Sequence, residues 1–147
     1  MDQRIDVLEL EPQAYRAMTG LEQYLKGTDL SLKLRELIKI RASQINGCAY
    51  CIEMHTKEAK KAGESEQRMY ALSAWWESPL FDEEERVALA MTDEITKITE
   101  RGLTKETYQK AEKLFSSNAI AQIIMQIGVI NIWNRIAVAT HKRYPED

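Results

Sequence analysis

The two cysteines of this chain lie close together and are followed by a histidine. Two residues separate Cys48 from Cys51, and His55 comes four residues after Cys51. Two thiols on one helical turn can close a disulfide with little rearrangement, as a dithiol that cycles between redox states must. An imidazole four residues further along a helix lies on the same face, where it can accept a thiol proton near neutral pH. The segment therefore predicts a redox-active dithiol.

The residues before Cys48 place it at the start of a helix. Asn46 and Gly47 tolerate left-handed backbone angles and predict the end of the preceding helix. Unpaired amides and the helix dipole at an N-terminus stabilise a thiolate, so this position lowers the pKa of a cysteine. Helix position thus favours Cys48 as the more acidic thiol, whereas His55 favours Cys51. The sequence leaves this choice open.

The same residues allow plainer interpretations. Cys48 and Cys51 could be inert core thiols, since free cysteine is often buried. They could also bind zinc with His55, but only three ligands are present, and the other histidine, His141, is distant in sequence. A thioredoxin fold also carries Cys-x-x-Cys, yet it needs strands that this sequence does not indicate. We therefore predict neither a metal site nor a cofactor.

Length and composition describe one globular domain spanning residues 1–147. The chain is 44% hydrophobic and 29% charged, and 147 residues can bury a core without disulfide staples. A net charge of -3 without a basic face argues against nucleic-acid binding. The N-terminus lacks an apolar signal region, which predicts a cytoplasmic protein in which a purely structural disulfide is not expected.

One stretch, residues 114–134, is uncharged over 21 residues, which is long enough to span a membrane. Serine, asparagine and glutamine side chains interrupt it, so we expect a buried helix and no membrane contact.

Helical spacing and capping residues recur along the chain. They predict an all-α, single-domain bundle of about six to seven helices. The expected helices cover residues 12–25, 29–44 or 31–44 (with Asp29 or Ser31 as the cap), 48–62, 66–76, 82–101, 104–115 and 117–140. The last is apolar on most faces, so it must be central or lie between subunits.

Three groups of residues outside the dithiol have types or positions that need an explanation. By helical spacing, Glu53 and Glu58 do not lie on the helix face that carries Cys51 and His55, so we assign them to solvent or to ion pairs. Trp75 and Trp76 are interpreted as core or interface packing. The polar residues of the last helix must find partners; they are Asn131, Asn134 and Arg135.

Glu36 is a weak candidate alone but completes a pattern. Glu36, Cys48, Cys51 and His55 match the Glu-x11-Cys-x2-Cys-x3-His motif of AhpD-like alkylhydroperoxidases, within the carboxymuconolactone decarboxylase family. Residues 45–56 are also typical of small members, and the resemblance covers about residues 34–98. It implies an all-α fold, a homo-oligomer (commonly a trimer or hexamer) and thiol-dependent reduction of hydroperoxides.

The resemblance also implies residue roles. Cys51 would attack the hydroperoxide and become a sulfenic acid, and Cys48 would resolve it to a disulfide. An external dithiol, lipoyl or thioredoxin-like, would reduce that disulfide. Glu36 and His55 would form a proton relay, in which Glu36 orients His55.

One position departs from the family pattern. Tyr50 stands where well-studied AhpD enzymes carry histidine, and tyrosine is a poor base at neutral pH. This change leaves open a non-catalytic redox sensor or a general disulfide reductase as the alternative to a peroxidase. The family's decarboxylases generally lack the cysteine pair, which argues against lactone decarboxylation here.

Overall fold

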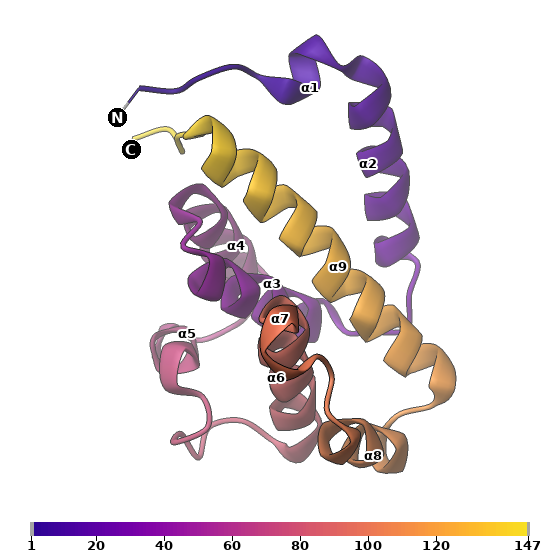
Figure 1. Cartoon of the computed structure of the whole chain (residues 1–147). Coiled ribbons are helices and arrows are strands. Elements are labelled where there is room, and N and C mark those ends of the chain that lie inside the picture. Colours follow the sequence, from indigo (N-terminus) through magenta and orange to yellow (C-terminus); the bar gives the residue numbers. More distant parts are fainter. Residues whose placement is uncertain (1, 147) are drawn as a thin grey trace.

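The computed structural model describes residues 2–146, which fold into nine α-helices and one 3-10 helix without a strand (Figure 1). The all-α prediction is confirmed. The helix count exceeds six to seven because two four-residue helices were not expected: α1 (Val7–Leu10) and α7 (Ile98–Arg101). The longer helices are α2 (Pro12–Lys26), α3 (Leu32–Asn46), α4 (Ala49–Lys61), α5 (Glu66–Ala71), α6 (Glu83–Thr96), α8 (Lys105–Leu114) and α9 (Ser117–Thr140), and η1 (Leu72–Ala74) follows α5.

The turn between α3 and α4 delivers the dithiol. Gly47 ends α3 with φ of 65°, the left-handed conformation that glycine adopts without steric cost. The Cys48 amide then donates a hydrogen bond to the Ser43 carbonyl at 3.0 Å. Cys48 is the N-cap of α4, and its sulfur accepts a hydrogen bond from the Cys51 amide. The sequence prediction for this turn is confirmed.

Helix α9 crosses the molecule and packs against α2, α3, α4, α6 and α8 (Figure 1). Its length and composition would let it cross a membrane. Two of its asparagines, however, bond to α3: Asn46 Nδ2 donates to Asn131 Oδ1 and Asn134 Oδ1, both at 2.9 Å, and Asn134 donates to Ser43 at 3.0 Å. The helix is therefore the central helix of a bundle, one of the two predicted positions.

Two predicted helices end earlier than expected. The helix predicted over 82–101 begins with a capping box of Asp82 and Glu85, but Lys97, with ψ of 46°, separates α6 from α7. The helix predicted to Trp76 is α-helical only to Ala71 and then tightens into η1. Helix α9 begins at Ser117, and Ser116 rather than Ser117 is its N-cap.

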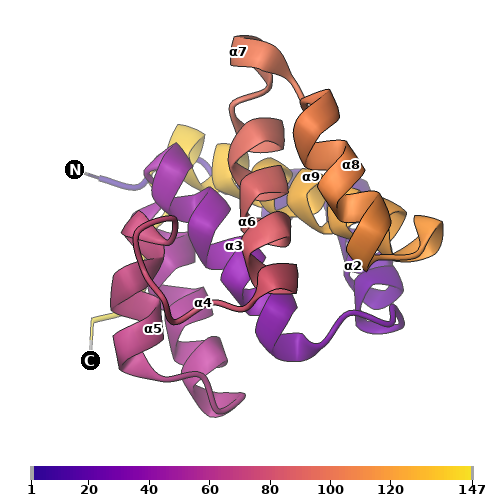
Figure 2. The same cartoon turned by 90° about the horizontal axis from the view of Figure 1, so that it is seen from below.

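The main core lies where α3, α6, α8 and α9 meet (Figure 2). Its fully buried members include Ile38, Met91, Ile123 and Ile127. A second cluster packs α3 against α4, α5 and the 3-10 helix around Leu37, Ile40 and Leu72. Both clusters hold α3 from opposite sides, which fixes the helix that carries Glu36.

Candidate redox site

The two cysteines are joined by a disulfide, with Cα atoms 5.3 Å apart. Both are buried, Cys48 to 1% and Cys51 to 2% of full exposure. Cys51 lines a cavity of about 790 Å³ together with Glu36 and His55. Cys48 lines a second cavity of about 450 Å³ beside the end of α9, which adjoins the first because Tyr50, Ala137 and Lys142 line both. The two cysteines of the disulfide thus line different cavities.

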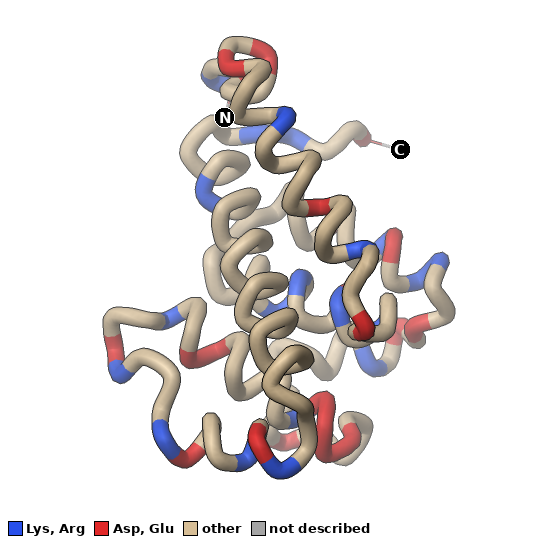
Figure 3. The backbone as a smooth tube through the Cα atoms, turned by 90° about the vertical axis from the view of Figure 1, so that its right-hand side faces the viewer, with Lys and Arg blue, Asp and Glu red and all other residues tan. Residues whose placement is uncertain are grey.

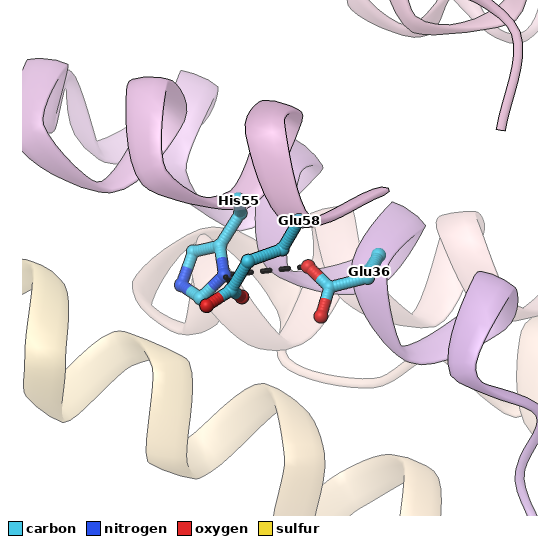
Figure 4. Close-up of side chains that lie close together, drawn as sticks. All are labelled: Glu36, His55 and Glu58. Atoms are coloured by element: carbon cyan, nitrogen blue, oxygen red, sulfur yellow. Dashed lines mark hydrogen bonds and ion pairs between the residues drawn. The ribbon is translucent and has the colours of Figure 1, made fainter. Parts of the chain in front are cut away.

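His55 lies between two carboxylates (Figure 4). Its Nδ1 atom is 3.1 Å from Glu58 Oε2 and 3.3 Å from Glu36 Oε2. Glu58 comes from the next turn of α4, whereas Glu36 reaches His55 from α3. The structure therefore brings together Glu36 and His55, two of the predicted site residues, and adds Glu58 to them.

The environment of Glu36 is unusual for a carboxylate. Glu36 is 2% exposed, and its Oε1 lies 2.6 Å from the Lys39 ammonium in a buried pair. Its Oε2 accepts no hydrogen bond, although it faces His55 Nδ1 within ion-pair distance. A buried carboxylate is costly unless positive charges compensate it. Lys39 and a protonated His55 supply that compensation.

These contacts change how His55 titrates. Burial by itself would lower the pKa of His55, but the carboxylates of Glu36 and Glu58 outweigh burial and raise it above 6.5. The hydrogen bond with His55 in turn lowers the pKa of Glu58. His55 therefore holds a proton more firmly than an ordinary histidine, as a proton donor near neutral pH requires.

The same three side chains could be considered as metal ligands, because their donor atoms all lie within 4.8 Å of one another. The Lys39 ammonium, however, already neutralises Glu36 and would repel a cation beside it. The sulfurs of Cys48 and Cys51 are bonded to each other, so in this state they are not thiolate ligands. The arrangement fits a proton better than a metal ion.

Tyr50 and the segment after α9 lie beside the disulfide. The rings of Tyr50 and Tyr144 are 5.5 Å apart, and the Lys142 ammonium lies 4.7 Å from the Tyr50 ring centre. Lys57 lies 4.6 Å from the ring of Tyr144. Tyr50, which replaces the family's histidine, is thus held by aromatic and cation–π contacts.

Sequence reasoning missed some neighbours of the site. Glu58 does form an ion pair, as predicted, but its partner is His55, its i,i+3 neighbour, which helical spacing could have identified. Lys39 is likewise the i,i+3 neighbour of Glu36. No sequence signal pointed to Tyr144. Glu53 is exposed, which agrees with its assignment to solvent or to ion pairs.

Trp75, Trp76 and Arg135 line neither of the two cavities. Trp75 packs at the second core cluster and donates a hydrogen bond to Asp93 at 3.1 Å, whereas Trp76 is 51% exposed. Arg135 donates to Asn131 Oδ1 at 2.8 Å on its own helix. The prediction that the polar groups of α9 find partners is confirmed for these residues.

Comparison with known proteins identifies the family. Residues 12–94 match the model of the carboxymuconolactone decarboxylase family. The chain is 40% identical to the uncharacterized protein YdfG of Bacillus subtilis over 143 residues, which is 97% of each chain.

Solved structures agree with this assignment. A protein of unknown function from Agrobacterium tumefaciens, named as a candidate antioxidant defence protein AhpD, is 40% identical, with a TM-score of 0.96 over 99% of this chain and 100% of that one. The debrominase Bmp8 has the same fold at 21% identity, with a TM-score of 0.83 over 94% of this chain and 74% of that one. The chain belongs to the carboxymuconolactone decarboxylase family and is an AhpD-like member of it.

Proposed function

We propose that this protein is a thiol-dependent peroxidase that reduces alkyl hydroperoxides through Cys48 and Cys51. The observation that carries the proposal is the shared cavity: Cys51 borders the same 790 Å³ space as Glu36 and His55. A nucleophile, a proton relay and room for a substrate therefore meet in one place.

The reaction begins with both thiols reduced. The Cys51 thiolate attacks the terminal peroxide oxygen, the O–O bond breaks, and Cys51 becomes a sulfenic acid. The departing alkoxide takes a proton from His55, so an alcohol leaves. The Cys48 thiol then attacks the Cys51 sulfur, water leaves, and the disulfide seen in the structure forms. The peroxide gains two electrons and the dithiol loses two.

Glu36 and Glu58 would have different effects on His55. Glu36 is buried and fixed by Lys39, so it orients the imidazole and stabilises its charged form. Glu58 has a side chain that is 48% exposed and touches the same nitrogen. It can therefore pass protons between His55 and solvent. The relay predicted from Glu36 and His55 gains a third member in this proposal.

The cycle needs an external dithiol, lipoyl or thioredoxin-like, to reduce the disulfide again. We place this cycle in the cytoplasm, where thiol reductants are abundant. The alternative, a redox sensor without turnover or a general disulfide reductase, uses the same disulfide. It differs in that peroxide would not be consumed catalytically.

We also propose that the protein forms a homo-oligomer, trimeric or hexameric, through the outer face of α9. Figure 3 shows that this helix is uncharged along most of its length. Three apolar side chains on it are each between 38% and 42% exposed: Ile124, Met125 and Ile132. Exposed apolar residues on one helix favour association between copies. Light scattering of the protein and of Ile132→Asp would test this, because the substitution should dissociate the oligomer.

Steady-state consumption of cumene hydroperoxide, with dihydrolipoamide as reductant, tests the peroxidase proposal. The intact protein should turn over, and one equivalent of peroxide should remove two protons from the reduced protein by closing the disulfide. Cys51→Ser and Cys48→Ser should abolish turnover, and His55→Ala should reduce it by about 100-fold. Full peroxide consumption by Cys51→Ser, or thiols that stay free, would contradict the mechanism. Disulfide closure without turnover would favour the sensor.

A further inference from the structure

The two sulfurs of the disulfide face different environments. Cys51 opens into the larger cavity, beside Glu36 and His55, and Cys48 opens into the smaller one. The smaller cavity lies between the start of α4 and the end of α9, where Gly47 and Val138 border it. Neither Glu36 nor His55 lines this space. The smaller cavity thus has no part in the peroxide step proposed above.

The smaller cavity is positively charged. Lys142 and Arg143 line it, and none of the described residues that line it is acidic. Arg143 makes an exposed ion pair with Asp2 at 3.6 Å, which exposure and salt weaken. Lys142 is held over the Tyr50 ring. The larger cavity, which Lys142 also borders, carries charges of both signs: it holds Glu36 and Glu58 with Cys51, and Lys39 pairs with Glu36.

We propose that the smaller cavity is the docking site of the reductant, a small dithiol that carries a carboxylate, and that its thiolate attacks Cys48. The inference rests on the proposed function and names the partner of its reductive half. The carboxylate lies beside Lys142 and Arg143, which also attract the incoming thiolate.

The position of the attack follows from the chemistry of disulfide exchange. A thiolate approaches a sulfur from the side opposite to the bond that breaks. Approach through the smaller cavity reaches Cys48 and expels Cys51 into the larger cavity. Attack on Cys51 would instead release the Cys48 thiolate into the smaller cavity, which His55 does not line. Attack on Cys48 is therefore favoured, because the departing Cys51 thiolate shares its cavity with the protonated His55, which stabilises it as a leaving group.

The exchange balances in two steps. The first reductant thiolate, whose proton has gone to solvent, bonds to the Cys48 sulfur, and the Cys48–Cys51 bond breaks. The electron pair stays on Cys51, which takes the proton of His55, and His55 is reprotonated from solvent. The second reductant thiol then loses its proton and attacks the reductant sulfur of the mixed disulfide. Cys48 leaves and is protonated, so the reductant loses two electrons and the protein gains two.

The sulfur attacked can be identified without peroxide. The oxidised protein is mixed with 3-mercaptopropionate, a monothiol that cannot complete the second step, and is quenched at once with N-ethylmaleimide. Both cysteines lie in one tryptic peptide, residues 42–57, whose fragmentation by mass spectrometry separates them. We expect the mercaptopropionyl group on Cys48 and the maleimide on Cys51. The reverse pattern overturns the proposal, whatever the outcome of the peroxidase assay.

The charge preference is tested with two dithiols that differ only far from their thiols. Dihydrolipoate carries a carboxylate, and dihydrolipoamide carries a neutral amide. We measure the rate at which each reduces the protein disulfide, by the appearance of protein thiols, in the intact protein and in Arg143→Glu, because Arg143 lines the smaller cavity and not the larger one. The ratio of dihydrolipoate rate to dihydrolipoamide rate should fall at least about threefold in the variant at low ionic strength. An unchanged ratio overturns the proposal.

A matched variant controls for net charge. Lys113 is exposed on α8, which precedes the opposite end of α9. Lys113→Glu changes the net charge of the protein by the same amount as Arg143→Glu. Its rate ratio should equal that of the unmodified protein. An equal fall in both variants would mean that overall charge governs the rate, which contradicts docking in the smaller cavity.

Discussion

The carboxylate of Glu58 lies closer to the His55 imidazole than the carboxylate of Glu36 does, at 3.1 Å against 3.3 Å from Nδ1. Both reach the same nitrogen, but they differ in exposure. Glu36 is enclosed with Lys39, whereas half of the Glu58 side chain meets solvent. One carboxylate thus fixes the imidazole and the other connects it to water.

Removing the charge of Glu58 should make His55 easier to deprotonate. In Glu58→Gln the imidazolium loses one of the two carboxylates that raise its pKa, so the titration midpoint of His55 should fall. NMR titration of the imidazole carbons measures this midpoint, and only one other histidine signal must be assigned, with a His141→Asn variant. An unchanged midpoint would mean that Glu36 alone sets the pKa.

The raised pKa of His55 also makes folding stability depend on pH. A group whose pKa is higher in the folded state stabilises the fold fully below its unfolded value, here about 6.5, and loses that contribution as pH rises through the folded-state pKa. The free energy of unfolding of the intact protein, relative to His55→Gln, should therefore decrease from pH 6 towards pH 9. Urea denaturation at several pH values measures the difference. A difference that grows with pH would contradict the assignment.

Peroxide should leave its oxygen on Cys51 when Cys48 is absent. Cys48→Ser cannot resolve the sulfenic acid, so one equivalent of cumene hydroperoxide should produce a Cys51 species that dimedone labels. Intact-mass analysis detects the adduct. Cys51→Ser is the control and should stay unlabelled under the same conditions. Labelling of Cys48 in that control, at a similar rate, would reverse the roles.

Tyr50 offers a test of the departure from the family pattern. Histidine at this position, next to Cys51 in sequence, would add a base near neutral pH. Tyr50→His should therefore raise the rate of peroxide consumption, whereas Tyr50→Phe, which keeps the ring beside Tyr144, should leave it nearly unchanged. A large loss in Tyr50→Phe would show that the tyrosine hydroxyl itself takes part.

The amide network of α9 should be important for stability. Asn134 is fully buried and bonds to Asn46 and Ser43, so Asn134→Ala leaves buried polar groups unpaired and should cost about 2 kcal/mol. Denaturant unfolding measures the loss. Asn118→Ala, on an exposed position of the same helix, should change stability by less than about 0.5 kcal/mol.

The local features of the site could be predicted because they depend on residues near in sequence. Gly47 ends one helix and Cys48 begins the next, as turn chemistry requires. The approach of Glu36 to His55 is different, since it depends on how α3 packs on α4, and only the family pattern indicated it. The break at Lys97 follows no strong sequence signal, because neither proline nor glycine marks it.

The residues that line the smaller cavity could not be predicted from the sequence, for another reason. Val138, Lys142 and Arg143 lie about 90 residues beyond Cys48, and no periodicity connects the two segments. Only the path of α9 across the bundle brings its end to the start of α4. Such a contact depends on the tertiary fold, so no local sequence pattern predicts it.

Helix α3 carries Glu36 and ends at Gly47, so one continuous helix sets the distance between the carboxylate and the dithiol. Each residue of a helix advances about 1.5 Å and turns about 100°. A one-residue insertion between Ile38 and Ser43 would thus point Glu36 away from His55 while every functional side chain remained present. The length of this helical spacer is therefore as much a part of the candidate site as the residues at its ends.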